Sequence, residues 1–357
     1  DAKTNFSFPT VKVQRAARSL SPDGSRVLFV EGSSSGIGDT KTGSLLFDLM
    51  EDSMRVGAAS FSPDGKRVVT AGVNEKRDAA GNVIHKDAMV HVWGANTGLS
   101  LFSFAIRPVE TTSVVFSPDG NRVLTLNDDH SGRIWDVQTG TLLITIPLYL
   151  KAPVASFSPD GRYVAIASQD GTTHFWDANT GKWLFRLKGH SGEVLDASFS
   201  PDGRRFVTAS ADRTARLWLR DNNGGFTLQT ILLGHSEAVA NARFSPDSTR
   251  IVTASFDGTT RIWDVQTGIL MMNFANNPGG YDPVAFSRDG TELVTIGRDG
   301  LYIHSTKLDF YMRRACELLR GHRDEFQDVT DVCKRVGVLP LPPLPNGIPV
   351  SQTERSG

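Results

Sequence analysis

The sequence predicts an all-β fold built from seven similar antiparallel sheets. The first observation behind this prediction is a phrase, Phe-Ser-Pro-Asp-Gly or a close variant, that recurs along the 357 residues. The copies begin at Leu20, Phe61, Phe116, Phe157, Phe199, Phe244 and Phe286. The steps between them are 41, 55, 41, 42, 45 and 42 residues. A period of this length is typical of repeat architectures.

The second observation is that one repeat has room for four short strands. In the fifth repeat they are expected at 195–199, 205–210, 214–218 and 226–231, in segments rich in β-branched and aromatic residues. The Pro-Asp-Gly of the phrase forms a tight turn between the first two strands. One such sheet cannot bury both of its faces, whereas seven sheets around a common axis cover one another. The sequence therefore predicts a seven-bladed β-propeller of four-stranded antiparallel blades.

The first and last repeats depart from the common pattern. The third strand of the first repeat is expected near 35–39, and no good fourth strand follows Ser305 in the last repeat. Segment 4–8 can supply that missing strand. Both ends of the chain would then close the ring, which removes an exposed sheet edge.

Composition excludes several classes of partner and compartment. The chain carries 38 Lys and Arg against 39 Asp and Glu, a formal net charge of −1, so no strong field attracts nucleic acid or a membrane surface. No segment approaches the roughly 20 apolar residues of a membrane helix, so no membrane insertion is expected. The only cysteines, Cys316 and Cys333, form no disulfide framework, which favours a reducing, cytoplasmic location.

Tryptophan and Gly-His pairs give the repeats a family resemblance. Trp-Asp ends the third strand at Trp135, Trp176 and Trp263, and degenerate forms stand at Trp93 and Trp218. Gly-His precedes two repeats, at 189–190 and 234–235. Over about residues 4–306, the chain resembles the WD-repeat family of seven-bladed β-propellers. The near-identical Ser-Pro-Asp-Gly phrases suggest a bacterial type.

The resemblance implies a hydrogen-bonded brace inside a blade, made by a His, a Ser or Thr, an Asp and the Trp. One brace would consist of His190, Ser210, Asp212 and Trp218, and a second of His235, Ser255, Asp257 and Trp263. A catalytic triad is the alternative interpretation of these groups. The brace is favoured because the pattern repeats, whereas an active site normally occurs once.

The C-terminal segment differs from the repeats and divides the chain into three parts: the propeller at 1–306, a helical extension at 307–338 and a Pro-rich tail at 339–357. Apolar spacing predicts one helix at 308–319 and a weaker one at 325–336. Segment 339–345 is expected to be polyproline-like, as a linker or as a docking ligand. The phrase at 313–319 resembles the closing segment of large bacterial signalling proteins.

No residue pattern supports catalysis, a metal or a cofactor. Residues 32–36 match a nucleophile elbow but lie in a loop with no following helix. The group at 128–130 occupies a tight turn rather than a metal site. The sequence therefore indicates a non-catalytic scaffold that binds a protein or peptide partner. A sensor or regulatory domain of a larger bacterial signalling protein or enzyme is the alternative, and an enzyme built on the propeller channel is a third.

An insertion in the second repeat is a candidate binding element. The step from the Ser of the phrase to the Trp takes 18 residues in repeats three to six, but 31 in repeat two. The added stretch, about 72–88, contains Glu75, Lys76 and Arg77 and is predicted to form a polar hairpin. Long loops on rigid scaffolds often carry function, although a merely tolerated insertion is the alternative.

Partner contacts are also expected between the sixth and seventh repeats. By the resemblance, two kinds of position point to the face that carries the Gly-His loops. In these two repeats they are occupied by Phe256, Tyr281 and Arg298, and Glu193 and Lys151 occupy equivalent places in other repeats. Aromatic side chains and arginine are typical of interface hot spots. Ordinary packing of Phe256 beneath a neighbouring loop is the alternative.

Overall fold

A computed structural model describes residues 10–11, 17–31, 34–49, 54–77, 83–106, 110–150, 152–275, 284–297 and 300–306. The chain divides into two units, Asp1–His304 and Ser305–Gly357, and the ring described below belongs to the first. The helices predicted at 308–319 and 325–336, and the Pro-rich tail, lie outside the described residues.

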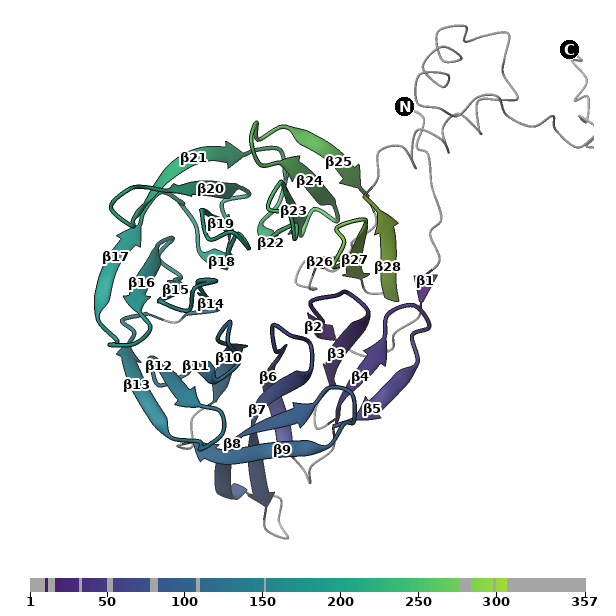
Figure 1. Ribbon diagram of the computed structural model, residues 1–357, viewed down its shortest axis with the longest axis vertical. Coiled ribbons are helices and arrows are strands. Elements are labelled where there is room, and N and C mark those ends of the chain that lie inside the picture. Colours follow the sequence, from purple (N-terminus) through teal and green to yellow (C-terminus); the bar gives the residue numbers. More distant parts are fainter. Residues whose placement is uncertain are drawn as a thin grey trace, which may run out of the picture. The chain divides into compact units, whose positions relative to one another are not determined.

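Seven four-stranded antiparallel sheets surround a common axis, which confirms the predicted seven-bladed β-propeller (Figure 1). Blades one to three consist of β2 (Ala17–Leu20), β3 (Arg26–Glu31), β4 (Ser34–Asp39) and β5 (Leu45–Asp48); β6 (Met54–Phe61), β7 (Arg67–Arg77), β8 (Val83–Gly94) and β9 (Ser100–Ile106); and β10 (Thr111–Phe116), β11 (Arg122–Asn127), β12 (Ser131–Asp136) and β13 (Leu142–Pro147).

Blades four to six follow the same order, with the first strand nearest the axis and the fourth on the circumference (Figure 1). They consist of β14 (Ala155–Phe157), β15 (Tyr163–Ala167), β16 (Thr173–Asp177) and β17 (Trp183–Leu187); β18 (Val194–Phe199), β19 (Arg205–Ser210), β20 (Ala215–Arg220) and β21 (Phe226–Leu232); and β22 (Val239–Phe244), β23 (Arg250–Ser255), β24 (Thr260–Asp264) and β25 (Leu270–Phe274).

The seventh blade joins the two ends of the ring. It has the strand order β1 (Thr10–Val11), β28 (Gly300–Ser305), β27 (Glu292–Gly297) and β26 (Val284–Phe286). Thr10 pairs with Tyr302, and Val11 pairs with Leu301. The predicted closure by an N-terminal strand is therefore confirmed. The described strand is Thr10–Val11, and the predicted segment 4–8 lies outside the described residues.

The repeated phrase forms the turn between the first and second strands of each blade. In blade two, the Ser62 hydroxyl donates to Asp64 Oδ1 over 2.6 Å, and the Gly65 amide donates to the Ser62 carbonyl over 2.8 Å. Gly65 has φ +67°, a conformation that costs glycine little. Ser248 takes the same conformation in the loose sixth copy, with φ +59°. The turn chemistry thus explains why this phrase recurs.

The aromatic residue of the phrase contacts an arginine from the preceding blade. The Arg122 guanidinium lies 5.7 Å from the centre of the Phe157 ring, and it donates to the Gly161 carbonyl over 3.0 Å and to the Ala178 carbonyl over 2.9 Å. Arg26, Arg67 and Arg250 lie in the same way over Phe61, Phe116 and Phe286. Such contacts combine cation–π attraction with charge-assisted hydrogen bonds. They fasten one blade to the next at four junctions.

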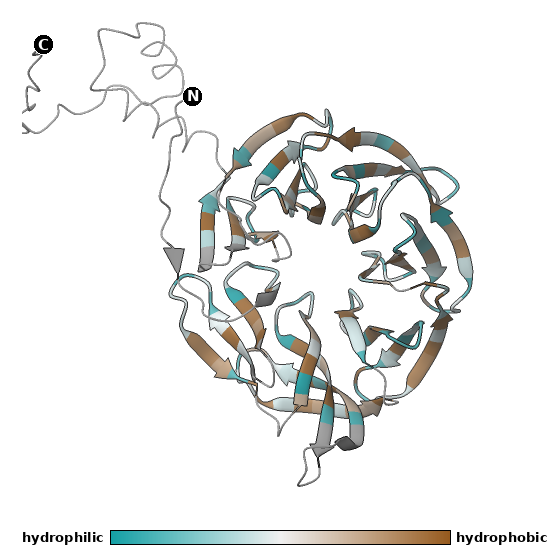
Figure 2. Cartoon of the chain, turned by 180° about the vertical axis from the view of Figure 1, so that it is seen from behind, coloured by the Kyte–Doolittle hydropathy of each residue, from teal (hydrophilic) through white to brown (hydrophobic). Residues whose placement is uncertain are grey.

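The core lies between adjacent blades. One cluster joins Val69 and Val92 of blade two to Val114 and Trp135 of blade three, and equivalent clusters fill the next three junctions. The second strands are almost fully buried, whereas the fourth strands are largely exposed. Hydrophobic residues also occur along the circumference, as the brown segments there show (Figure 2).

His304 stands in the last blade where blades two to six carry the tryptophan. Its Nε2 lies 3.1 Å from Thr295 Oγ1, the same kind of contact that Trp263 Nε1 makes with Thr253 Oγ1 over 2.8 Å. The imidazole also lies against the Phe274 ring, with 4.6 Å between ring centres. Burial lowers the pKa of His304 from the ordinary 6.5 to about 4. The folded blade therefore holds a neutral imidazole.

We predict that acid weakens the seventh blade through His304. The unfolded chain takes up a proton below pH 6.5 while the folded chain does not, so this stabilisation is complete above pH 6.5 and is lost as the pH falls towards 4. We compare the unfolding free energies of the wild type and of His304→Gln. The difference in favour of the wild type should decrease by up to about 3 kcal/mol between pH 7 and pH 4. Urea unfolding at each pH measures it. A difference independent of pH would contradict the prediction.

We also predict that β1 contributes to ring closure. Deleting residues 1–11 removes the pairs with Tyr302 and Leu301 and should lower the unfolding free energy by about 1 to 3 kcal/mol. Deleting only residues 1–9 leaves Thr10–Val11 in place and serves as the matched control. Thermal unfolding compares the two. An unchanged melting temperature for the longer deletion, or an equal loss for the control, would refute the role of Thr10–Val11.

Candidate partner-binding face

Two kinds of loop meet on one side of the ring, which we call the loop face. One kind leads from the fourth strand of a blade to the first strand of the next, and the other joins the second and third strands. The Ala211 amide donates to the Glu193 carbonyl over 2.9 Å, and the Phe256 amide donates to the Ala238 carbonyl over 3.0 Å. Because β18 begins beside the end of β19, the Ser-Pro-Asp-Gly turns lie on the opposite face.

A chain of hydrogen bonds ties the loop face to the interior of blade five. Trp218 Nε1 donates to Thr208 Oγ1 over 3.0 Å, and Thr208 Oγ1 lies 2.8 Å from His190 Nε2. His190 Nδ1 lies 2.8 Å from Asp212 Oδ2. Blade six repeats the arrangement with Trp263, Thr253, His235 and Asp257, at 2.8 Å for each contact.

The pKa of the histidine determines which atoms carry the protons in this series of hydrogen bonds. Burial, the largest effect, lowers the pKa of His190 despite the neighbouring Asp212. A neutral imidazole that donates from Nδ1 to Asp212 must accept at Nε2, so the Thr208 hydroxyl donates to it. Burial alone would raise the pKa of Asp212, but hydrogen bonds from Thr214 and His190 outweigh it and lower the pKa. Each of the four side chains of this brace then has a hydrogen-bond partner.

The hydroxyl that joins the histidine to the tryptophan is not the one expected from the sequence. Ser210 donates instead to the Gly192 carbonyl over 3.1 Å and accepts from the Asp212 amide over 3.1 Å. Ser255 makes the equivalent bonds to the Glu237 carbonyl and the Asp257 amide. These serines attach the loop to the turn. The threonine two residues earlier, Thr208 or Thr253, takes the central position.

Burial favours a structural role for these groups over a catalytic one. His190 and Asp212 form the His–carboxylate contact that hydrolases use, with Thr208 as a hydroxyl. Their side chains are only 2% and 6% exposed, and Thr208 is buried, so a substrate has no access to the hydroxyl. Within the described parts of the chain, no three His, Cys, Asp or Glu side chains form a metal-binding group.

We predict that Thr208 stabilises the blade more than Ser210 does. Thr208→Val leaves the buried Trp218 donor and the His190 acceptor without a hydrogen-bond partner. It should lower the unfolding free energy by about 2 to 4 kcal/mol. Ser210→Ala removes bonds to Gly192 and Asp212, which are half-buried and can bond water instead, and should cost about 1 kcal/mol. Denaturant unfolding of both variants measures the difference. Equal costs, or a larger cost for Ser210→Ala, would show that the central hydroxyl has been misassigned.

Of the five residues predicted at these positions, two are described. Phe256 lies in the turn between β23 and β24 on the loop face and is 38% exposed. Glu193 lies on the same face, before β18, and is half-buried. Tyr281, Arg298 and Lys151 lie outside the described residues. The structure thus places Phe256 and Glu193 on one face.

The insertion in repeat two is a long β-hairpin that continues the second and third strands. β7 and β8 remain paired as far as Arg77 and Val83, and Glu75 lies opposite Lys86 in this register. The hairpin begins at the loop-face end of the blade and extends beyond the ring of neighbouring blades (Figure 1). The described parts of the insertion, up to Arg77 and from Val83, therefore extend the sheet of blade two.

Two exposed apolar side chains on the loop face were not predicted. Tyr149, in the loop between β13 and β14, is 86% exposed, and Leu233, just before the Gly234-His235 pair, is 66% exposed. Neither belongs to a repeated motif, so their signal in the sequence is only an apolar residue in a connecting loop. With Phe256 they place apolar surface on the loops of blades four to six.

Comparisons with known proteins agree with the repeat pattern. Residues 107–136, 152–177, 181–218 and 226–264 match the family model described as WD domain, G-beta repeat. These stretches include the first three strands of each of blades three to six. A search of curated proteins found no match. Among the described residues, no helix has the length and apolar character needed to cross a bilayer.

Proposed function

Since the chain carries WD repeats in a seven-bladed propeller, we propose that it is a non-catalytic scaffold that binds a protein or peptide partner on its loop face. Fold alone does not establish function. The observation that carries the proposal is the exposed apolar surface of Tyr149, Leu233 and Phe256, all on the loop face. Large apolar side chains surrounded by polar loops are typical of interface hot spots.

Neighbouring features support a polypeptide partner. Glu193 lies in the loop that precedes blade five, and it offers a carboxylate on the same face. We include Tyr281, Arg298 and Lys151 in this interface on the strength of their repeat positions. We also include the hairpin that contains Glu75, Lys76 and Arg77. The near-zero net charge favours a protein partner over nucleic acid.

A second proposal concerns the context of the propeller. The phrase at 313–319, Arg-Arg-Ala-Cys-Glu-Leu-Leu, favours a sensor or regulatory domain of a larger bacterial signalling protein or enzyme. The length of the gene's reading frame tests this proposal. Only two cysteines occur, which supports a cytoplasmic location.

We predict that Leu233→Ser weakens partner binding at least tenfold, which corresponds to about 1.4 kcal/mol. A partner is first isolated with the intact chain, and its dissociation constant is then measured by calorimetry. Ile269→Ser is the matched control, because Ile269 is 65% exposed and lies in the turn between β24 and β25 on the other face. Phe256→Ala should act like Leu233→Ser.

Two results would contradict binding on the loop face. The first is an equal loss of affinity for Ile269→Ser and Leu233→Ser. The second is unchanged affinity for both Leu233→Ser and Phe256→Ala. A fall in unfolding free energy above about 2 kcal/mol for Phe256→Ala would instead identify Phe256 as a packing residue.

A further inference from the structure

Blade four lacks the central members of the brace that blades five and six contain. Val164 pairs with Trp176, and Ile166 stands two residues after Val164. In blade five, Thr208 stands two residues after the residue that pairs with Trp218. Ile166 therefore holds the position of the bridging threonine. The segment 147–154, which leads into the blade, contains no histidine. Trp176 and the turn residue Asp170 remain. The tryptophan and the aspartate of the brace are therefore present without the histidine and the threonine that connect them in blades five and six.

Trp176 has a buried donor without a partner. Its side chain is 5% exposed, and its Nε1 has no hydrogen-bond partner among the described residues. In contrast, the indole nitrogens of Trp93, Trp135, Trp218 and Trp263 each donate to a threonine hydroxyl over 2.8 to 3.0 Å. A buried N–H that bonds neither protein nor ligand is unfavourable, so this group favours a site that receives an acceptor.

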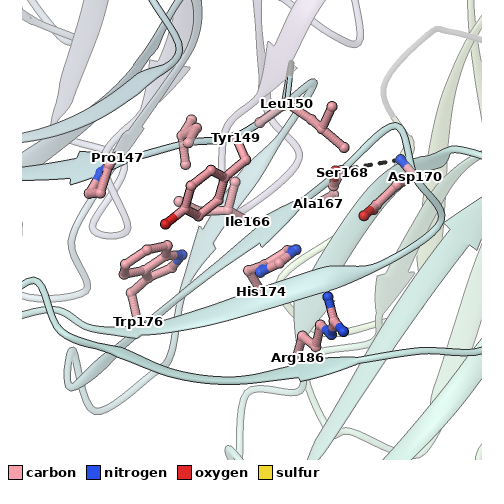
Figure 3. Close-up of a pocket in the computed structure, with 12 residues that line it drawn as sticks. Pro147, Tyr149, Leu150, Ile166, Ala167, Ser168, Asp170, His174, Trp176 and Arg186 are labelled. Atoms are coloured by element: carbon pink, nitrogen blue, oxygen red, sulfur yellow. Dashed lines mark hydrogen bonds between the residues drawn. The ribbon is translucent and has the colours of Figure 1, made fainter.

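A cavity of about 210 Å³ adjoins Trp176, and its lining includes Tyr149, Leu150 and Asp170 from the loops of the loop face. Figure 3 shows Tyr149, Ile166, His174 and Trp176 around it, with Asp170 and Arg186 towards one side. The walls formed by Leu148, Ile166 and Ala152 are apolar. The cavity is large enough for a planar side-chain group together with its aliphatic stem.

His174 does not supply the missing hydrogen bonds. Thr172 donates its hydroxyl proton to Asp170 Oδ1 over 2.6 Å, so it accepts from His174 Nε2, which lies 2.9 Å away. His174 Nδ1 accepts from Trp183 Nε1 over 3.4 Å. Burial lowers the pKa of His174, the neighbouring Arg186 acts in the same direction, and Asp170 opposes them. The ring is neutral, and both of its nitrogens are engaged.

Asp170 provides an acceptor in the same cavity. Its Oδ1 accepts from the Thr172 amide and hydroxyl, whereas the equivalent of its Oδ2 in blade five accepts from His190. In blade four, no described histidine donates to Oδ2 of Asp170, because both nitrogens of His174 are engaged elsewhere. Burial raises the pKa of Asp170, but the bonds from Thr172 and Ser168 lower it overall, so the carboxylate is ionised near neutral pH.

We propose that this cavity receives a glutamine, asparagine or neutral histidine side chain of the partner polypeptide. The occupant must offer an acceptor to Trp176 and an N–H donor to Asp170 on separate atoms of one planar group, and only these side chains do so. Guanidinium and ammonium groups lack the acceptor, and a carboxylate lacks the donor. In blades five and six, the chain's own imidazole and a threonine hydroxyl together connect the equivalent carboxylate to the equivalent indole. This inference rests on the proposed function, since it names a contact on the same face.

Indole N–H resonances of the full-length chain test the proposal directly. Imidazole and propionamide are the probes, and acetate and guanidinium are the controls that lack a donor or an acceptor. The Trp176 signal, identified from its loss in Trp176→Phe, should shift in a saturable way with both probes and with neither control. The Trp218 signal, which reports a donor already bonded to Thr208, should stay unchanged in the same spectra.

Ile166→Thr supplies Trp176 with an acceptor from the chain itself and should weaken imidazole binding at least tenfold. Ile231→Thr makes the same exchange on β21 of blade five, away from the cavity, and should leave binding unchanged. The inference is overturned if neither probe shifts the Trp176 signal, if acetate or guanidinium shifts it equally, or if Ile166→Thr binds imidazole as the wild type does. None of these results would contradict the proposed function, because a separate measurement, the affinity of Leu233→Ser for the partner, tests it.

Discussion

Burial of each sheet by its two neighbours is the constraint on which this fold depends. The hydrophobic clusters lie between blades and not within them, so no blade has a complete core alone. Arginines that cross to the next blade, such as Arg122 over Phe157, fix the rotation of one sheet against another. The ring must therefore close, and β1 closes it by pairing with β28.

The closed, tightly packed ring explains how loops with little regular structure keep a defined arrangement on one face. The hydrogen-bonded chain from Trp218 to Asp212 holds the connecting loop of blade five against the turn between its second and third strands. Blade six has the same restraint. Blade four lacks it, and its cavity lies at the place where the restraint is missing. The same position thus stabilises two blades and leaves an open site in a third.

The sequence predicted what local chemistry determines. Ser-Pro-Asp-Gly specifies a turn by itself, so seven copies predicted seven blades, and the spacing predicted their strands. Two hydroxyls two residues apart, Thr208 and Ser210, lie on the same side of a strand, and the pattern alone could not distinguish their partners. The outer strand of blade seven depends on pairing between residues about 290 apart, which no local pattern fixes. The cavity was missed because its signal is an absence, with Ile166 in place of a threonine and no histidine before the blade.

We propose that the loop face of blades four to six binds a polypeptide. Amide hydrogen exchange of the full-length chain, with and without its isolated partner, tests this most directly. We expect slower exchange in the partner complex at the connecting loops 147–152 and 233–238 and at the turn 256–259, with the Ser-Pro-Asp-Gly turns unchanged. Protection confined to those turns, or to the fourth strands on the circumference, would contradict it.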